Sequence, residues 1–521
     1  MAATRPPTVL VIIDGFGYNP NKEGNAIASA TTPAMDDLWS HYPHALLKAA
    51  AEEVGLTFGQ IGNSEVGHTA IGAGRIVPSP YQRIQNSLEK GTFYQNEAFI
   101  KAVQVAQTRG STIHIIGMIS QAGVHADLKH LIGLLKIIKE NLCKRVYIHA
   151  ILDGRDTGPR EAVIHFGVVE KAIKDMDIGI VATICGRAYA MDRNKNWERT
   201  KAYYDAIVGD PACTLSIPDY HKAIVHYYEQ QLDDEVIPPT IIDPAGKIKD
   251  NDVVIMVNFR EDRIRQITHA LVDPNFNAFQ RTTKPTNLYV VTMTMYERTF
   301  PVNAIAYGPV QIPNTFSDVL EANNLTQLHI AETEKYAHVT YFLNGGRESK
   351  LPHEDFIHIP SDPPDKFATN PHMQAGRITD EAVKALKAKT YDVIVINFAN
   401  CDMIGHTGDF AKTTETISYL DSCIKAIAEE VLAQKGMFFL TSDHGNAELK
   451  VDFNTGRTSK DHTVNPVPFL MAKENMKKPN DPLTKITFGA RVSGILQDVA
   501  PTILTYMELS IPDEMTGVRV F

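Results

Sequence analysis

Short runs of apolar residues recur along the chain, and most of them end in a polar or charged side chain. The first run, Thr8–Ile13, is continuous, rich in β-branched residues and followed at once by Asp14. Runs of this length without polar alternation predict strands that are buried on both faces, as in parallel sheets. Runs of the same character occupy residues 112–119, 145–152, 179–184, 252–258, 392–397 and 436–440.

Segments with apolar residues at helical spacing separate several of these runs. Residues 129–140 and 161–174 each place their apolar side chains on one face of a helix. Strands that alternate with helices predict an α/β fold with largely parallel sheets. Between residues 351 and 374 the pattern is lost and Pro, Asp and His are frequent, which predicts a long loop or lid.

Two proline-rich stretches divide the chain. Residues 76–80 read Ile-Val-Pro-Ser-Pro, and prolines recur between residues 300 and 313. A chain of 521 residues is also too long for one ordinary core. We therefore expect a discontinuous domain of residues 1–78 and 312–521, with a second α/β domain of residues 79–311 inserted into it.

Composition narrows the partners that the chain can have. A hydrophobic content of 44% and a charged content of 21% are typical of a soluble globular protein. The net charge of −10 argues against binding nucleic acid or a membrane surface through a basic face. The five cysteines form no CxxC pair, and no apolar run is long enough to span a membrane. We expect a cytoplasmic monomer without nucleic-acid or membrane partners.

One glycine-rich stretch presents a serine. Residues 59–75 contain five glycines around Ser64. Because glycine permits sharp turns and close approach of a ligand, this pattern predicts a loop with Ser64 at its apex. The alternative is a surface loop with a capping serine. A serine hydroxyl is a weak nucleophile unless a base or a metal activates it, so other parts of the chain must supply that activation.

Three buried runs of the discontinuous domain end in acids or in acid–histidine pairs, and a further histidine lies in a polar loop before two prolines. Carboxylate and imidazole ligands without thiolate suit Mn²⁺, Zn²⁺, Mg²⁺ or Co²⁺, and six of them suffice for two sites. Two metal ions can clamp a phosphoryl group, and one can hold Ser64 as an alkoxide. The candidate ligands are Asp14, Asp402, His406, Asp443, His444 and His462.

The apolar runs of the inserted domain differ from those of the discontinuous domain in that basic side chains follow them. For any one arginine, a solvated surface charge is the simpler interpretation. Their repeated position after buried strands favours instead a convergent set that binds a small, highly anionic substrate. A nucleotide is less favoured, because neither Gly-x-x-x-x-Gly-Lys-Ser/Thr nor Gly-x-Gly-x-x-Gly follows a strand. The candidates are His125, Arg155, Asp156, Arg187, Arg193, Arg260 and Arg263.

With these residues the chain resembles the cofactor-independent (2,3-bisphosphoglycerate-independent) phosphoglycerate mutases of the alkaline phosphatase superfamily. The resemblance covers nearly the whole chain. Residues 120–127 depart from the family pattern, with Ser-Gln-Ala-Gly-Val-His-Ala-Asp where Ser-Asp-Gly-Gly-Val-His-Ser-His is usual. The matching motifs are Asp14-Gly-Phe-Gly17, Gly62-Asn-Ser-Glu-Val-Gly-His68, Leu152-Asp-Gly-Arg-Asp-Thr157, Tyr189-Ala-Met-Asp-Arg193, Glu332-Thr-Glu-Lys335, Ser442-Asp-His-Gly-Asn446 and Asn465-Pro-Val-Pro468.

The resemblance implies an alkaline-phosphatase-like metal-binding domain with an inserted phosphotransferase domain. It implies an isomerase of glycolysis and gluconeogenesis that interconverts 3-phosphoglycerate and 2-phosphoglycerate through a phosphoserine at Ser64, without 2,3-bisphosphoglycerate. It also implies two divalent ions, commonly Mn²⁺. One ion would be held by Asp402, His406 and His462, and the other by Asp14, Ser64, Asp443 and His444.

The same resemblance adds Lys335 to the residues that would bind the phosphoglycerate, namely His125, Arg155, Asp156, Arg187, Arg193, Arg260 and Arg263. Asp156 or His125 would move protons.

Three alternative functions remain: a metal-dependent phosphatase or sulfatase, a phosphopentomutase, and a phosphometabolite-binding module without activity. The arginine-rich inserted domain argues against hydrolysis, because it would retain glycerate and exclude water. The intact Ser64 argues against a binding module, because binding alone needs no nucleophile.

Overall fold

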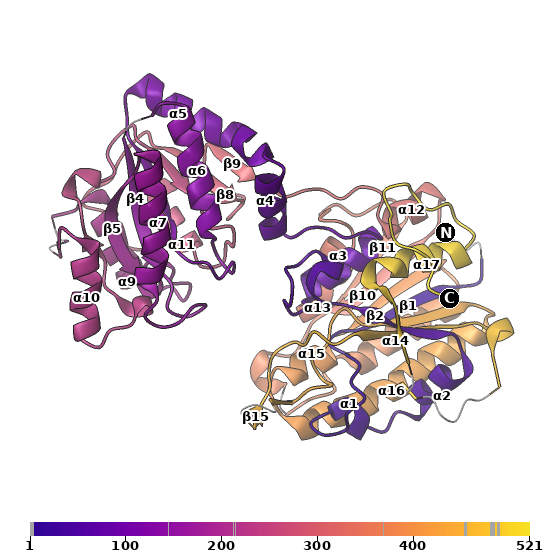
Figure 1. Ribbon diagram of the computed structural model, residues 1–521. Coiled ribbons are helices and arrows are strands. Elements are labelled where there is room, and N and C mark those ends of the chain that lie inside the picture. The colour runs from indigo at the N-terminus through magenta and orange to yellow at the C-terminus, as the bar shows by residue number, and fades with distance from the viewer. Residues whose placement is uncertain are drawn as a thin grey trace. The chain divides into compact units, whose positions relative to one another are not determined.

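The computed structural model divides the chain into two compact units (Figure 1). Unit 1 comprises Met1–Ser79 and Val310–Phe521, and unit 2 comprises Pro80–Pro309. The joints expected from the sequence, 78/79 and 311/312, compare with divisions at 79/80 and 309/310. The structure describes residues 5–143, 145–211, 213, 215–367, 369–452, 456–479, 485–486 and 490–521.

Unit 1 is built on an eight-stranded sheet with the order β11-β10-β12-β1-β13-β16-β2-β17. Strand β1 pairs in parallel with β12 on one side and with β13 on the other, so these three strands end at the same edge. Strand β16 runs antiparallel to β13 and β2. The strands are β1 (Thr8–Ile13), β2 (His44–Lys48), β10 (Gln327–Glu332), β11 (Glu354–Ile359), β12 (Val393–Phe398), β13 (Met437–Thr441), β16 (Val467–Ala472) and β17 (Val492–Ile495).

Helices cover both faces of this sheet, as Figure 1 shows. Strand β1 is buried along its whole length, and its side chains alternate between the two faces. Val9 and Val11 pack with α2, α14 and α16, whereas Leu10 and Ile12 pack with α3, α12 and α17. These helices are α2 (Pro33–His41), α3 (Ser64–Ala73), α12 (Phe316–Ala322), α14 (Ala375–Ala388), α16 (Phe410–Ala433) and α17 (Val499–Tyr506).

Unit 2 contains a seven-stranded sheet with the order β6-β5-β4-β3-β7-β8-β9. All neighbouring strands are parallel except β5 and β6. The polar segments that follow β3, β4, β5 and β7 therefore start from one edge. The strands are β3 (Ile113–Met118), β4 (Val146–Leu152), β5 (Ile180–Gly186), β6 (Thr240–Ile241), β7 (Val253–Met256), β8 (Tyr289–Thr294) and β9 (Ala304–Tyr307).

Two layers of helices bury the sheet of unit 2. Ile113 and Ile115 face one layer, whereas Ile116 and Met118 face the other. This alternation is the period of two that a strand buried on both faces requires. The first layer contains α4 (Pro80–Glu89), α5 (Glu97–Arg109), α6 (Leu128–Glu140), α7 (Ala162–Met176) and α10 (Tyr220–Glu229), and the second contains α8 (Arg187–Ala190), α9 (Trp197–Val208) and α11 (Arg265–Val272).

The α/β prediction is confirmed, and each predicted apolar run carries a strand. The prediction of a long loop or lid between residues 351 and 374 is wrong in part. Residues Glu354–Ile359 form β11, which pairs in parallel with β10 at the edge of the sheet. Only Glu354 and Ile359 of this strand are buried, so its sequence lacks the continuous apolar run of a central strand.

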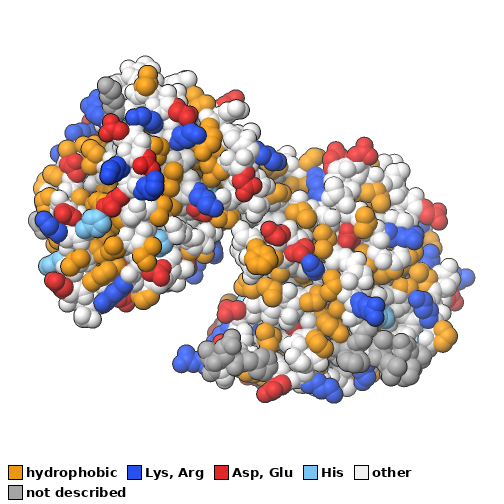
Figure 2. Space-filling view, viewed as in Figure 1, with side chains coloured by type: hydrophobic (Ala, Val, Ile, Leu, Met, Phe, Trp, Pro, Cys, Tyr) orange, Lys and Arg blue, Asp and Glu red, His pale blue; other side chains and the backbone are white. Residues whose placement is uncertain are grey.

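The surface agrees with the mixed charge of the sequence. Figure 2 shows acidic and basic side chains interspersed on the face in view. Among the residues that the structure describes, no helix combines the length and the hydropathy needed to cross a membrane.

Candidate functional site

Three acids meet at the carboxyl edge of the unit 1 sheet. Asp14 follows β1, Asp443 follows β13, and Asp402 lies in helix α15 (Asn400–Gly405), which follows β12. Because β1 lies between β12 and β13, the parallel pairing brings the three together. Their exposed fractions are 0% for Asp14, 2% for Asp402 and 0% for Asp443. Three carboxylates so deeply buried require compensating positive charge.

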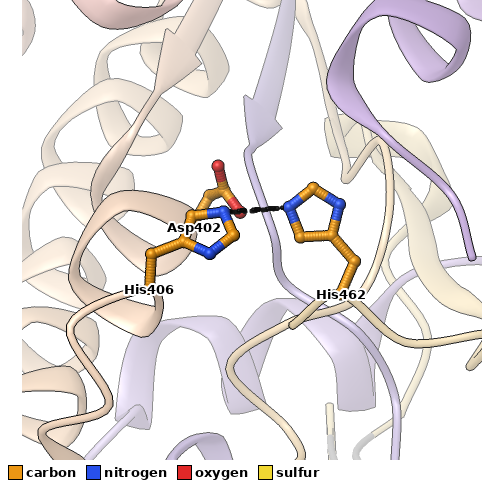
Figure 3. A group of neighbouring side chains, drawn as sticks. All are labelled: Asp402, His406 and His462. Carbon is orange, nitrogen blue, oxygen red and sulfur yellow. Dashed lines mark hydrogen bonds and ion pairs between the residues drawn. The ribbon is translucent and has the colours of Figure 1, made fainter. Parts of the chain in front are cut away.

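Asp402, His406 and His462 form the first ligand group (Figure 3). His406 lies one helical turn after Asp402, as the four-residue spacing predicted. The Nε2 atoms of His406 and His462 lie 3.2 Å and 3.0 Å from Asp402 Oδ1, and 3.0 Å from each other. The sequence therefore identified three residues that converge, including one from a distant loop.

Asp14, Asp443 and His444 form the second group, and Ser64 joins it. His444 Nε2 lies 3.5 Å from Asp14 Oδ1 and 3.4 Å from Asp443 Oδ2. The Ser64 hydroxyl lies 2.9 Å from His444 Nε2 and donates to Asp14 Oδ1 at 3.2 Å. The four residues expected to share an ion are thus adjacent in space.

Ser64 itself does not lie at the apex of a loop, and that prediction is corrected. It is the first residue of α3, and the Asn63 side chain caps the helix by accepting from Val66 N. The glycines of the stretch serve close packing instead, because a Cβ at Gly67 or Gly72 would overlap a neighbouring carbonyl group. The free amides and the dipole at the start of a helix favour an anion, so Ser64 lies at a position that favours a negatively charged group.

The three histidines fit a divalent metal. The Nδ1 atoms of His406, His444 and His462 lie 2.7, 3.2 and 2.8 Å from the carbonyl oxygens of Lys460, Gly445 and Gly62, respectively. A carbonyl oxygen only accepts, so this contact places the hydrogen on Nδ1 and leaves the Nε2 lone pair facing the acids. Lone pairs and carboxylate oxygens packed this closely are the donor set that a cation requires.

Lys335, in helix α13 (Thr333–Ala337), lies between the two groups. Its ammonium donates to Asp14 Oδ1 at 2.6 Å, to Asp402 Oδ2 at 2.7 Å and to Ser64 Oγ at 2.7 Å. Burial acts to lower the pKa of Lys335, but the surrounding carboxylates raise it above its ordinary value. Lys335 therefore remains a cation that contacts the candidate nucleophile directly.

Two supporting residues were missed from the sequence. Asn397 Nδ2 donates to Asp14 Oδ2 at 3.0 Å and lies 2.9 Å from His68 Nε2. The other ring nitrogen of His68 lies 2.8 Å from the Ser64 carbonyl oxygen. Asn397 ends an apolar run and His68 ends the Ser64 motif, so their positions in the sequence suggested a place near the site. No spacing rule indicated their hydrogen-bond partners.

Unit 2 contains a cavity of about 270 Å³ that is lined by arginines. Burial and then the charges of Arg193, Arg187 and Arg155 lower the pKa of Arg263, as is expected where guanidinium groups lie close together. Arg199 and Glu235 also line the cavity and were missed from the sequence. The four expected arginines in the lining are Arg155, Arg187, Arg193 and Arg263.

Carboxylates of unit 2 hold these arginines. Arg187 is buried and pairs with Asp153 at 2.7 Å and with Asp156. Arg155 pairs with Glu235. A fourth acid, Asp262, pairs with the expected Arg193 at 2.8 Å and Arg260 at 3.2 Å. Arg260 is not part of the cavity lining described above.

His125 is almost fully buried beside the same acids. Its Nε2 lies 4.0 Å from Asp156 Oδ2, and its Nδ1 lies 3.6 Å from Asp262 Oδ1. Burial and the Arg187 charge lower the pKa of His125 to about 4. His125 is therefore neutral near pH 7 and is able to accept a proton. Seven of the expected substrate contacts belong to unit 2, whereas Lys335 belongs to unit 1.

Comparisons with known proteins agree over the length of the chain. The model of the Metalloenzyme superfamily matches residues 6–511. A 2,3-bisphosphoglycerate-independent phosphoglycerate mutase of Clostridium perfringens is 42% identical over 521 residues, which is 99% of this chain and 99% of the relative. The enzyme of the same name from Acaryochloris marina is 43% identical and covers 98% of this chain and 95% of its own.

A solved structure has the same fold. Crystal structures of a Leishmania mexicana phosphoglycerate mutase at low cobalt concentration superpose with a TM-score of 0.67. The sequence identity is 29%, and the match covers 100% of this chain and 98% of that chain. Together with the two ligand groups, these matches support the use of divalent metal ions.

Proposed function

The chain belongs to the 2,3-bisphosphoglycerate-independent phosphoglycerate mutases, which are isomerases, and we propose that it interconverts 3- and 2-phosphoglycerate through a phosphoserine at Ser64. The observation that carries this proposal is the position of the Ser64 hydroxyl. It contacts Lys335, Asp14 and His444 at the start of a helix, with both ligand groups around it. These contacts support Ser64 as the nucleophile and as the residue that carries the phosphoryl group between the two transfers.

In the proposed reaction, Ser64 Oγ attacks the phosphorus atom of 3-phosphoglycerate, and the bond to the substrate oxygen breaks. Lys335 donates to Ser64 Oγ and stabilises its negative charge. Divalent ions, when bound, would add charge that stabilises the serine alkoxide and the phosphoryl oxygens. Asp402, His406 and His462 would hold one ion, and Asp14, Ser64, Asp443 and His444 the other, with Mn²⁺ as the first candidate.

The arginines of unit 2 would keep the glycerate bound while the phosphoryl group is on Ser64. A guanidinium group donates two parallel hydrogen bonds to a carboxylate or a phosphate. This geometry supports a role in binding both the carboxylate and the phosphate of the substrate. The leaving 3-oxygen takes up a proton, the glycerate reorients, and its 2-hydroxyl oxygen loses a proton as it takes the phosphoryl group back. His125 is neutral and is suited to move the hydroxyl proton. Asp156, whose Oδ2 lies 4.0 Å from His125 Nε2, is the second candidate for this proton transfer.

The test is an assay of purified protein with 3-phosphoglycerate, without added bisphosphoglycerate, before and after chelation. We expect 2-phosphoglycerate to form, and activity to be lost with the chelator and restored by Mn²⁺. Steady release of phosphate without the second isomer would favour a phosphatase or sulfatase-type hydrolase. Turnover of pentose phosphates alone would favour a phosphopentomutase, and binding without turnover would favour a phosphometabolite-binding module.

A further inference from the structure

Glu448 lies in the loop after β13 and is fully buried, yet it is not one of the candidate ligands. Its Oε2 accepts from Gly17 N at 3.1 Å and from Asn446 N at 2.9 Å. Its Oε1 accepts from Asn465 Nδ2 at 3.0 Å and from the Thr463 hydroxyl. All four partners are donors, which is the arrangement that satisfies a buried carboxylate.

The four donors come from three separate segments, and each segment carries a candidate metal ligand. Gly17 belongs to the turn that Asp14 begins. Asn446 stands two residues after His444. Thr463 is the neighbour of His462, and Asn465 lies in the same loop. One carboxylate therefore joins ligands of both groups although it touches no ligand atom itself.

The backbone is shaped to admit this carboxylate. A Cβ at Gly17 would overlap the carboxyl group of Glu448, and a Cβ at Gly445 would overlap its Oε1. The absence of side chains at these two positions lets the two loops close on the carboxylate directly. Glu448 thus occupies a fitted site between loops, whereas a side chain that only filled space would need no such glycines.

A second branch leads from the same loop to Asp402. The Asn446 side chain donates to Asp402 Oδ1 at 2.9 Å, and Lys450 donates to the Asn446 amide oxygen and to Gly405 O at 3.1 Å. Lys450 fixes which end of the Asn446 amide faces Asp402. A Cβ at Gly405 would overlap that amide. The Glu448 loop therefore contacts the first ligand group in two ways, through the His462 loop and through the Asn446 side chain.

We propose that Glu448 is a positioning residue that holds the two metal-ligand groups in fixed positions relative to each other. The inference rests on the proposed metal-dependent function. Ligand residues held by outer hydrogen bonds lose roughly 10- to 100-fold in metal affinity when those bonds are removed. Replacing Glu448 should weaken both ions together, whereas replacing a ligand such as His406 should weaken only its own ion.

The two oxygens of Glu448 make the proposal more specific. Among the residues that the structure describes, Oε1 accepts hydrogen bonds from the His462 loop, and Oε2 accepts them from Gly17 and Asn446. Asn465→Ala removes one hydrogen bond on the Oε1 side and should weaken a single ion. Glu448→Gln keeps the shape: its oxygen can accept the two backbone donors while its amide donates to the Thr463 hydroxyl and to a flipped Asn465 amide. Glu448→Gln should therefore rescue most of the affinity.

The experiment titrates metal-free protein with Mn²⁺ and follows free Mn²⁺ by electron paramagnetic resonance. Thermal unfolding of each metal-free variant is measured in parallel. Glu429→Ala, an exposed glutamate of unit 1, is the matched control. We expect two ions for the unaltered chain and the control, both ions weakened at least about 10-fold in Glu448→Ala, one ion weakened in Asn465→Ala, and near-native binding in Glu448→Gln.

Unchanged affinities in Glu448→Ala would overturn this inference and leave the proposed function standing. Failure of the unaltered chain to bind Mn²⁺ would overturn both. If Glu448→Ala does not fold, Asn465→Ala decides: weakening of one ion supports the positioning role, and equal or absent weakening of the two ions overturns it.

Discussion

The ligand groups of unit 1 and the arginine group of unit 2 differ in how firmly the protein holds them. In unit 1 the acids are 0–2% exposed, and each ligand histidine is oriented by a backbone carbonyl group. In unit 2 the side chains of Arg155, Arg193 and Arg260 are 49%, 49% and 50% exposed and pair with acids of the same unit.

This difference suits two kinds of ligand. Metal ions require fixed donor atoms, and buried, multiply bonded side chains provide them. Exposed ion pairs contribute only about 0–1 kcal/mol each, so a phosphate or carboxylate of a substrate can replace Glu235 or Asp262 at low cost. In the proposed mechanism, a group that exchanges partners easily can follow the glycerate as it turns between the two phosphoryl transfers. We therefore infer that fixed chemistry belongs to unit 1 and adaptable binding to unit 2.

The largest expected effect follows from Ser64→Ala, which removes the proposed nucleophile of unit 1. We expect mutase activity to fall by at least about 10⁴-fold, because loss of a covalent nucleophile removes the reaction path itself. Initial rates of isomer formation measure the effect, and circular dichroism checks the fold. Ser422→Ala, on the exposed side of α16, should keep full activity. Substantial turnover by Ser64→Ala would contradict the phosphoserine mechanism.

A smaller effect is expected from Arg260→Ala in the adaptable group. Loss of a charged hydrogen bond worth about 1.5–3 kcal/mol should raise KM for phosphoglycerate roughly 10- to 100-fold. Bound metal, measured by elemental analysis, should not change, because arginine supplies no metal ligand. Arg109→Ala, an exposed arginine of unit 2 at the end of α5, is the control. Metal loss in Arg260→Ala would contradict the division of roles.

The last effect concerns stability instead of activity, at the end of β10. Burial raises the pKa of Glu332 from 4.5 to about 7, and its partners are Ser361 Oγ at 2.8 Å and the Gln374 backbone at 3.4 Å. The folded state therefore binds this proton more tightly than the unfolded state. The free energy of unfolding should fall by roughly 3 kcal/mol as the pH rises from about 4.5 to 7, and stay level above it.

Glu332→Gln should remove that loss, so the variant should gain stability relative to the native chain between pH 5 and pH 8. Urea unfolding of metal-free protein at the two pH values measures the difference. Glu429→Gln, an exposed position, should show no such change. Parallel pH profiles for the native chain and Glu332→Gln would show that Glu332 is not the group responsible.

The sequence indicated which candidate ligands lie together because the rule behind them is topological. Buried parallel strands end at one edge, so Asp14, Asp402 and Asp443 were expected at the same edge, and the strand order β12-β1-β13 makes them neighbours. The four-residue step to His406 added the helix that follows β12. The loop that brings His462 could be identified only by its histidine and by the resemblance to a known family.

Other features depended on contacts that no spacing reveals. The glycines around Ser64 suggested a loop with Ser64 at its apex, but Gly67 and Gly72 allow a helix to pack closely against neighbouring backbone. Glu448 gave no signal, and the position of Asn397 at the end of an apolar run did not reveal its partners, because most of these contacts join residues that are distant in sequence. Strand β11 was missed because an edge strand tolerates polar residues. The cytoplasmic location and the monomeric state stay predictions.

The most direct measurement traps the phosphoenzyme. Protein loaded with Mn²⁺ is mixed with 3-phosphoglycerate labelled in its phosphate, quenched in acid within milliseconds and digested for mass spectrometry. We expect the label on the peptide that contains Ser64 and, at later times, in 2-phosphoglycerate, with little free phosphate. Formation of labelled 2-phosphoglycerate without any labelled Ser64 peptide would contradict the central claim.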